Sequence, residues 1–239
     1  MKYEKPPIKS WSFSRLSDFE TCAYRAKLKV IDRLPEPERP LKPGQTEHAN
    51  DRGTRIHTEC ENYVKGAGEF PVEAKHFKPE FNALQSLYAK GVVSLEGEWG
   101  FDKNWKPCDY RHAWLRVKLD AGVLLTQKRL VVIDYKTGRK FGNEIKHSEQ
   151  ATLYGLTGAI RYPQVTEIDT ELWYLDQDEL THDARPVSKW LYFLKLFNNR
   201  GLKMTNATVF EPNPSKFACQ YCPYRNEGCE YAYREGEKK

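Results

Sequence analysis

The sequence predicts an α/β protein in which helices flank a central mixed β-sheet. Segments with apolar residues at helical spacing come first along the chain, and three segments with strand-like alternation follow them. A helix, a further strand and a final helix complete the order. Helices and strands interspersed in this way are typical of a single sheet covered by helices.

The first three helices are expected in the first part of the chain, at residues 11–34, 50–68 and 79–91. In the first of them, Ser14 is the predicted N-cap, ahead of apolar residues at helical spacing. In the second, Ile56, Cys60 and Val64 follow one face, and Gly66 and Gly68 end the helix.

The strands are expected in the middle of the chain, at residues 93–101, 112–125 and 128–138. In the first strand, Leu95 and Trp99 alternate with Glu96 and Glu98, as in a half-buried strand. The remaining elements are a helix closed by Pro163, a fourth strand and a long amphipathic helix, at residues 144–163, 166–175 and 186–201.

Composition restricts the class of protein. Hydrophobic residues make up 39% and charged residues 30% of the 239, as in soluble globular proteins. Lys, Arg or Asp interrupts the longest apolar runs, which argues against a membrane span, and the start MKYEKPPIKSW lacks the apolar region of a signal peptide. A cytoplasmic location is therefore expected. The net charge of +5 permits a polyanionic partner without establishing one.

Six cysteines in a cytoplasmic protein favour metal binding or reactive thiols over disulfides. Cys219, Cys222 and Cys229 form a C-x₂-C-x₆-C pattern near the C-terminus. A closed tetrahedral site or cluster needs a fourth ligand, and Cys22 in the first helix is the candidate. Spacing alone leaves zinc and an iron–sulfur cluster open.

Asp134 and Lys136 stand at the end of the apolar strand LVVIDYK. Side chains two apart in a strand share a face, so these two point the same way while Ile133 and Tyr135 face the other layer. If this strand pairs with the preceding one as a hairpin, Asp120 converges on Asp134. Two such carboxylates repel unless a cation lies between them, and hard oxygen ligands favour Mg²⁺ or Mn²⁺. Taken alone, D-x-K is more often an ordinary ion pair at a strand end.

The order of four motifs, RGTRIH at 52–57, LD at 119–120, IDYK at 133–136 and QATLY at 150–154, resembles the PD-(D/E)xK nucleases. It resembles most closely their RecB-like exonuclease branch, which includes CRISPR-associated and helicase-linked nucleases. The resemblance extends from Ser12 to Cys229. It implies a restriction-endonuclease-like core within residues 40–205 of a single nuclease domain spanning 1–239.

The resemblance assigns a role to each matching position. Asp120, Asp134 and the carbonyl of Tyr135 would bind Mg²⁺ or Mn²⁺, with His57 completing the coordination. Lys136 would position or activate the attacking water. Gln150 and Tyr154, one helical turn apart, would hold DNA or brace the site.

Three positions depart from the family pattern. Val117 stands where a glycine often precedes the first aspartate, and Asp134 stands where this branch usually has glutamate. Ala23 follows Cys22 where the family often has proline. The shorter Asp134 raises the question of an extra ligand, for which Glu96 and Glu98 are candidates, although a solvated strand face is the favoured interpretation of both.

The cysteines match the iron–sulfur subset of the same branch, in which one N-terminal cysteine and a C-terminal trio bind a [4Fe–4S] cluster. This implies a subdomain formed by residues 11–34 and 206–233, with zinc as the alternative metal. Basic side chains that suit phosphate contacts are Arg25, Arg52 and Arg55, although such residues more often form a solvated face.

The expected function is that of a metal-dependent deoxyribonuclease, a single-strand-preferring exonuclease acting in DNA recombination, repair or processing. The expected partners are DNA with single-stranded or free ends and a separate helicase or recombination protein, because the chain has no G-x-x-x-x-G-K-[ST] loop. Relatives that form rings make a homo-oligomer compatible, and the expected source is a bacterial, archaeal or phage-infected cell. The alternative is an inactive DNA-end-binding or adaptor protein that keeps the fold and the cluster.

Overall fold

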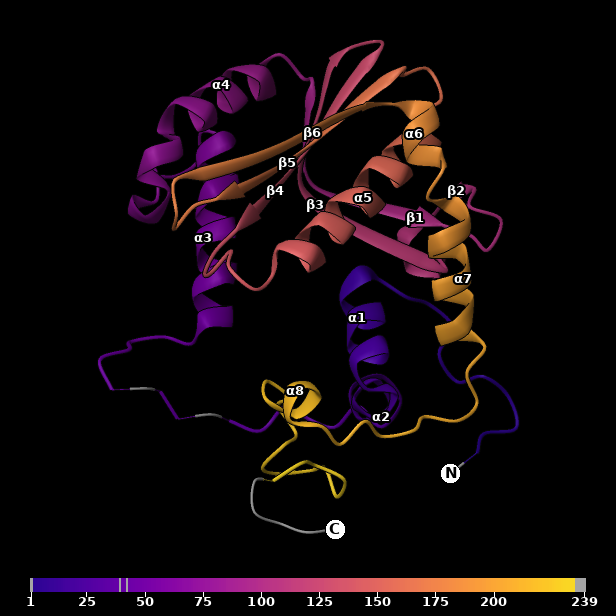
Figure 1. The fold of residues 1–239 in the computed structure, drawn as a ribbon. Helices are drawn as coiled ribbons and strands as arrows, with labels where there is room; N and C mark the ends of the chain where they lie inside the picture. The colour runs from indigo at the N-terminus through magenta and orange to yellow at the C-terminus, as the bar shows by residue number, and fades with distance from the viewer. Residues whose placement is uncertain (1, 39, 42, 235–239) are drawn as a thin grey trace. The chain divides into compact units, whose positions relative to one another are not determined.

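The structure is a computed structural model that describes residues 2–38, 40–41 and 43–234 (Figure 1). The chain forms two compact units. The smaller unit contains the chain up to Pro40 and from Leu196 onward, and the larger unit spans Leu41–Lys195. None of the described helices is both long and apolar enough to cross a membrane.

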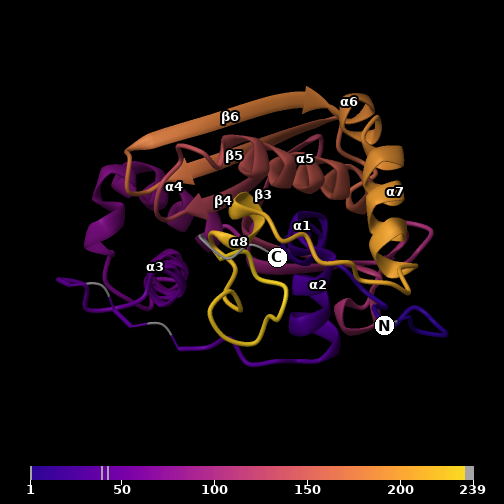
Figure 2. The ribbon, with the colours of Figure 1, turned by 60° about the horizontal axis from the view of Figure 1, so that its bottom comes forward.

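The larger unit is built on a six-stranded mixed sheet, which confirms the predicted fold class. The strand order is β2-β1-β3-β4-β5-β6, and only the β4–β5 pair is parallel. The strands are β1 Val93–Phe101, β2 Pro107–Cys108, β3 Leu115–Thr126, β4 Arg129–Lys136, β5 Glu167–Tyr174 and β6 Glu179–Pro186. The two edge strands, β2 and β6, were not predicted from the sequence. Figure 2 shows β6 along one edge of the sheet.

Helices cover both faces of the sheet (Figures 1 and 2). On one face, α3 (Ala49–Val64) and α4 (Lys78–Ala89), joined by a 3₁₀ turn at Val72–Phe77, pack on the odd-numbered side chains of β4. On the other face, α5 (Glu144–Arg161) packs against Leu172 and Tyr174 of β5 through Ala151. A second 3₁₀ turn, Tyr110–His112, precedes β3.

A glycine lets α5 approach the short helix α6 (Val187–Leu191) closely. A Cβ atom on Gly155 would lie 2.5 Å from the ring of Trp190, so only glycine fits there. The Trp190 ring is fully buried and its Nε1 donates a hydrogen bond to the carbonyl of Ile168. This contact fixes α5 on the sheet and thereby fixes the side chains that α5 contributes to the site described below.

The smaller unit joins both ends of the chain. It contains α1 (Phe13–Thr21), α2 (Ala23–Ala26), a π-helical turn (Lys27–Ile31), most of α7 (Leu194–Thr205) and α8 (Lys216–Cys219). Trp11 packs against α7 so closely that a Cβ on Gly201 would lie 2.6 Å from its ring. Arg200 of α7 forms two hydrogen bonds with Glu20 of α1.

Three details of the helix prediction were wrong. The N-cap of α1 is Ser12, whose hydroxyl accepts a hydrogen bond from the amide of Arg15, and not Ser14. The first helix is interrupted at Cys22, where the backbone is extended with φ of −160°. The last long helix is divided into α6 and α7 by a turn at residues 192–193.

Candidate active site

A cavity of about 530 Å³ opens on the larger unit, where α3 and α5 flank the ends of the central strands. Its walls come from α3, β1, β3, β4 and α5. They include His57, Glu96, Asp120, Asp134, Tyr135, Lys136, Gln150 and Tyr154. The structure thus brings together every residue that the sequence analysis assigned to the Mg²⁺ or Mn²⁺ site.

The cavity lies where β3 and β4 stop pairing. Their ladder runs up to the pair Ala121–Ile133 and ends there, one residue before Asp120 and Asp134. β4 continues along β5 as far as Lys136. Asp120 and Asp134 therefore lie opposite each other just beyond the last pair of the ladder, where the two strands separate. Their side chains can meet there.

Asp120 is held by two donors on its two oxygens. Its Oδ1 lies 2.8 Å from Nδ1 of His57, and its Oδ2 accepts a hydrogen bond of 2.5 Å from the backbone amide of Tyr135. Burial raises the pKa of Asp120, the His57 hydrogen bond opposes this, and the charge of Asp134 raises it further. Burial lowers the pKa of His57, but the hydrogen bond and charge of Asp120 outweigh it and raise the pKa above its ordinary value.

Asp134, Lys136, Gln150 and Tyr154 form a continuous polar network between β4 and α5. Lys136 Nζ donates to Gln150 Oε1 at 2.8 Å, Gln150 Nε2 donates to the Tyr154 hydroxyl at 2.6 Å, and that hydroxyl donates to Asp134 Oδ1 at 3.1 Å. Burial, with the charges of Asp134 and Asp120, raises the pKa of Tyr154 well above its ordinary value, so the phenol stays protonated.

The second oxygen of Asp134 has no hydrogen bond, although the residue is only 6% exposed. Lys136 Nζ lies 2.5 Å from this Oδ2, but without the geometry of a hydrogen bond, so the contact is an ion pair only. The Lys136 ammonium therefore compensates the charge of this buried oxygen in the structure. Because the oxygen accepts no hydrogen bond, it can also be a ligand for a metal ion.

Glu96 joins this site through an unusual backbone conformation. The β1–β3 ladder skips the position at which Glu96 faces Asp120, and Glu96 has φ of 47°, which is uncommon outside glycine. One ligand atom each from Glu96, His57 and Asp120 lies within 4.8 Å of the others. Glu96 also forms an ion pair with Lys118. Glu96 thus lies among possible metal ligands, whereas Glu98 is an exposed residue of the same strand.

The arginines expected at phosphate groups are engaged with carboxylates. Arg52 forms a bidentate pair with Asp176, at 2.7 and 2.9 Å. Arg55 bonds three glutamates, Glu47, Glu59 and Glu73. In the smaller unit, Arg25 lies 2.9 Å from Asp18.

The four cysteines of the predicted cluster line one pocket in the smaller unit. Cys22, Cys219, Cys222 and Cys229 share this pocket with Arg25 and Arg225. The amide of Asn213 donates to Cys22 Sγ at 3.3 Å, and the amide of Tyr233 donates to Cys219 Sγ at 3.4 Å. Burial raises the pKa of the Cys222 thiol, while a backbone hydrogen bond and the charge of Arg25 oppose the rise.

The chain is thus an α/β protein whose mixed sheet holds two carboxylates and a lysine together at a strand end. This arrangement is suited to metal-assisted hydrolysis of phosphodiesters. The family model described as PD-(D/E)XK nuclease superfamily matches residues 10–227. The chain belongs to this superfamily, and it is accordingly a nuclease with DNA as its class of substrate.

Three solved structures are similar at low identity. The crystal structure of SSO0001 is 14% identical, with a TM-score of 0.45 over 95% of this chain and 88% of that one. A putative exonuclease from Eubacterium rectale is 12% identical, with a TM-score of 0.45 over 90% and 86%. An alkaline exonuclease from Laribacter hongkongensis is 12% identical, with a TM-score of 0.29 over 81% and 91%. Among curated proteins, no sequence matches this chain.

Proposed function

We propose that this chain is a Mg²⁺- or Mn²⁺-dependent deoxyribonuclease of the RecB-like type that hydrolyses phosphodiester bonds in the cavity around Asp120 and Asp134. The observation that carries this proposal is the meeting of the buried Asp134 and the partly buried Asp120 beside Lys136, at the point where β3 and β4 separate. The buried Asp134 oxygen that accepts no hydrogen bond supports a cation at this place.

The residues that would hold the ion are His57, Asp120, Asp134 and the carbonyl of Tyr135. Their donor set of carboxylate oxygens with one imidazole suits Mg²⁺ or Mn²⁺. When bound, such an ion supplies positive charge to the phosphodiester oxygens and lowers the pKa of a bound water.

Lys136 is the residue that orients the attacking water. An ammonium group has three N–H donors. One is directed to Gln150 Oε1, and the ion pair with Asp134 fixes the side chain further, which leaves a donor for a water molecule in the cavity. The positive charge of Lys136 also stabilises the negative charge that develops on the phosphate oxygens.

Gln150 and Tyr154 brace the site in this proposal. The Tyr154 side chain is buried, and its hydroxyl accepts from Gln150 and has both Asp134 Oδ1 and the carbonyl of Lys118 as acceptors for its one hydrogen, each at 3.1 Å. Direct contact with DNA therefore suits Gln150, at the cavity wall, better than Tyr154. Arg25, Arg52 and Arg55 could contact phosphate groups only by sharing or exchanging their carboxylate partners.

The four cysteines are proposed to bind a [4Fe–4S] cluster in a subdomain of residues 11–34 and 206–233. Amide donors to cysteine sulfur, as found at Cys22 and Cys219, stabilise thiolate ligands and tune such clusters. Arg25 and Arg225 add positive charge to a pocket that would hold four thiolates. Zinc is the alternative metal, and the two are distinguished by colour, because Zn²⁺ proteins lack the brown visible absorption of iron–sulfur clusters.

The proposed substrate is DNA with single-stranded or free ends, degraded as an exonuclease during recombination, repair or processing. The proposed setting is the cytoplasm, with a separate helicase or recombination protein as partner and a homo-oligomer as a compatible assembly. The nuclease core is assigned to residues 40–205 of the domain 1–239.

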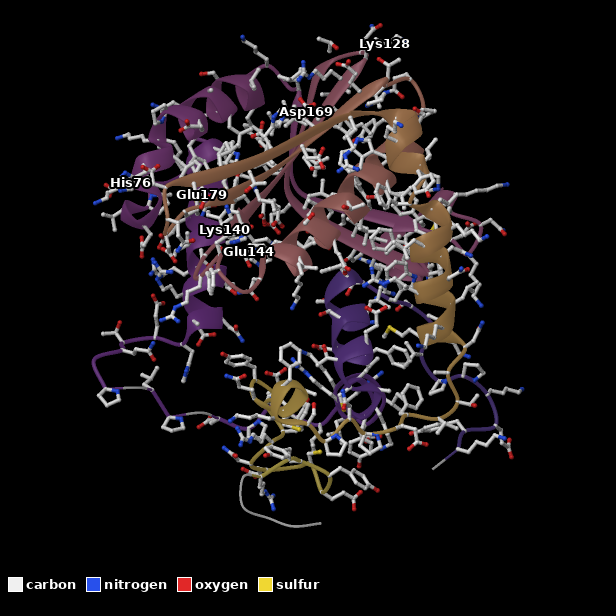
Figure 3. All side chains as sticks on the ribbon, viewed as in Figure 1. His76, Lys128, Lys140, Glu144, Asp169 and Glu179 are labelled. Carbon is white, nitrogen blue, oxygen red and sulfur yellow. The ribbon has the colours of Figure 1, made fainter. Side chains whose placement is uncertain are left out.

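The test is degradation of labelled single-stranded DNA by the purified chain with Mn²⁺ or Mg²⁺. We expect Lys136→Ala to lower the rate at least about 100-fold and EDTA to abolish it. Lys128→Ala is the matched control, because Lys128 is an exposed lysine of the same unit in the turn before β4 (Figure 3). Linear and circular strands compared side by side separate exonuclease from endonuclease action.

Equal degradation by Lys136→Ala and the unmodified chain would overturn the assignment of the site. Binding of DNA ends without degradation by either protein would instead establish the adaptor function.

A further inference from the structure

The loop between β4 and α5 follows directly on Lys136 and carries an exposed phenylalanine. Phe141 is 89% exposed, and Ile145 in the first turn of α5 is 80% exposed. Single exposed apolar residues are common on protein surfaces. The position of Phe141, five residues after Lys136 in the sequence, is what calls for an explanation.

The base of this loop is attached to the helix that carries His57. The amide of Gly138 donates to Asp176 Oδ2 at 2.6 Å, and the same carboxylate holds Arg52 of α3. A Cβ atom on Gly53, also in α3, would lie 3.0 Å from the hydroxyl oxygen of Thr137. The loop therefore keeps a defined position relative to the cavity.

The tip of the loop is also ordered by hydrogen bonds. The amide of Asn143 donates to the carbonyl of Lys140 at 2.9 Å, and its side chain donates to the carbonyl of Arg139 at 3.1 Å. The amide of Gly142 donates to Glu144 Oε2 at 2.7 Å. Phe141 is consequently presented to solvent by a structured turn.

A second pocket, of about 370 Å³, lies beside Phe141. It is lined by Arg139, Lys140, Phe141, Glu144, Gln177 and Glu179. Figure 3 labels Lys140, Glu144 and Glu179, which approach one another from the loop, from α5 and from β6. This volume is large enough for a nucleobase.

The charges of the pocket decide which part of a nucleotide it suits. Lys140 forms an ion pair with Glu179, and Glu144 accepts a hydrogen bond from the Gly142 amide. These three charged groups therefore have partners within the protein. The two basic and two acidic side chains of the pocket balance in charge, so its interior does not favour a phosphate over a neutral base. A neutral base can stack on the face of Phe141 and present its polar edge to Gln177.

Arg139 completes the complementarity to a strand. Of the residues that the structure describes, none forms an ion pair or side-chain hydrogen bond with the Arg139 guanidinium group, so its charge is available to a phosphodiester. An exposed aromatic ring next to an unpaired arginine is the combination that binds single-stranded nucleic acid.

We propose that Phe141 and Arg139 form a subsite for one unpaired nucleotide of the DNA strand that enters the cavity, the base stacking on Phe141 and a backbone phosphate pairing with Arg139. A base inside a duplex already stacks on both faces, so the subsite selects single-stranded or frayed ends. This inference rests on the proposed nuclease function, since it names the form of substrate that the same cavity would take.

The test measures base stacking without cleavage. Oligonucleotides with the fluorescent base 2-aminopurine at successive positions are titrated with the full chain carrying Lys136→Ala, in the presence of Mn²⁺. We expect quenching at one position. Phe141→Leu, which keeps an apolar side chain without an aromatic face, should abolish the quenching and weaken single-strand binding roughly five- to 100-fold. Phe141→Trp should retain the quenching and the affinity for single strands.

Two further variants make the result specific. Tyr192→Leu is the matched control, because Tyr192 is an 83% exposed aromatic residue of the same unit outside both pockets named above, and its loss should leave binding unchanged. Arg139→Gln should keep the quenching but weaken binding, and should reduce the slope of log affinity against log salt by about one.

The subsite is refuted if Phe141→Leu binds single strands with unchanged affinity and quenching, as it would if Phe141 served only a protein partner. It is equally refuted if Phe141→Leu weakens binding of blunt duplex and of single strands by the same factor. Failure of the nuclease proposal is separate, because it would appear as absence of metal-dependent degradation by the unmodified chain while position-specific quenching persists.

Discussion

Lys136 and Gln150 are joined by a hydrogen bond of 2.8 Å that connects the end of β4 to the middle of α5. This bond fixes the direction of an ammonium group that would otherwise be free to rotate about several side-chain bonds. Because the water-orienting role proposed for Lys136 depends on that direction, we expect Gln150→Leu to lower the rate of DNA hydrolysis by about 10- to 100-fold. Single-turnover kinetics at saturating Mn²⁺ measure this rate.

Two further variants show whether a lower rate comes from the lost orientation of Lys136 or from a loss of folding. Gln150→Glu keeps an acceptor for Lys136 and should retain more activity than Gln150→Leu. Ser148→Ala changes an exposed residue of the same helix and should leave the rate unchanged. If both Gln150 variants hydrolyse DNA at the unmodified rate, the hydrogen bond has no part in positioning Lys136.

A second prediction concerns Glu96, which lies with His57 and Asp120 in one group of possible ligands. Its backbone strain is of the kind that concentrates at functional sites. If the Glu96 carboxylate contributes charge to the ion, Glu96→Gln should weaken Mn²⁺ binding roughly tenfold or more. Isothermal titration calorimetry or electron paramagnetic resonance of Mn²⁺ measures the affinity without any substrate.

Glu98→Gln is the matched control, because Glu98 is two residues further along the same strand and exposed. It should bind Mn²⁺ with unchanged affinity. Equal affinities for the two variants would show that Glu96 serves only its ion pair with Lys118.

A third prediction concerns stability at mildly acidic pH. Burial, together with the charge of Lys136, lowers the pKa of His147 to about 4, and its Nδ1 lies 3.1 Å from the Tyr174 hydroxyl. Between pH 6.5 and about 4, the unfolded chain therefore binds a proton at His147 that the folded chain does not. The titration of His147 therefore lowers the free energy of unfolding as the pH falls through this window.

His147→Gln removes this titration, so the loss of stability between pH 7 and pH 5 should shrink by about 1–2 kcal/mol, a value discounted because His147 is only partly buried. Urea unfolding in EDTA at both pH values measures the difference. His112→Gln is the control, since His112 is exposed on the 3₁₀ turn before β3. An identical pH dependence for His147→Gln and the unmodified chain contradicts the prediction.

The polar ends of the central strands could be predicted from the sequence because strand periodicity is strict. Asp134 and Lys136 lie on the α5 side of the sheet, while Ile133 and Tyr135 are buried under α3 and α4, as the alternation required. The apolar run before Asp134 identified a central strand for the same reason.

Three other features of the structure leave no periodic pattern in the sequence from which they could be predicted. Strand β6 has mostly exposed side chains without apolar alternation, and it forms because its backbone pairs with β5. Glu96 enters the site through a left-handed backbone conformation, which no periodicity reveals. The break at Cys22 follows from an extended residue inside a segment whose apolar spacing is helical.

The last prediction concerns the glycine that seats α5. A methyl group at position 155 would lie 2.5 Å from the rigid Trp190 ring, which is fully buried and hydrogen-bonded to the carbonyl of Ile168. Neither the backbone of α5 nor the Trp190 ring can move without losing packing or this hydrogen bond, so Gly155→Ala should destabilise the fold by about 1–3 kcal/mol. It should also slow DNA hydrolysis in the fraction that stays folded, because a displaced α5 carries Gln150 away from Lys136.

Gly158→Ala is the matched control on the next turn, where a Cβ would meet the end of the Leu130 side chain at 2.9 Å, a contact that rotation of that side chain can relieve. Thermal unfolding and single-turnover rates of the two variants should therefore differ, with Gly155→Ala the more affected in both. Equal stability of the two would mean that Trp190 moves freely and that its packing does not determine the position of α5.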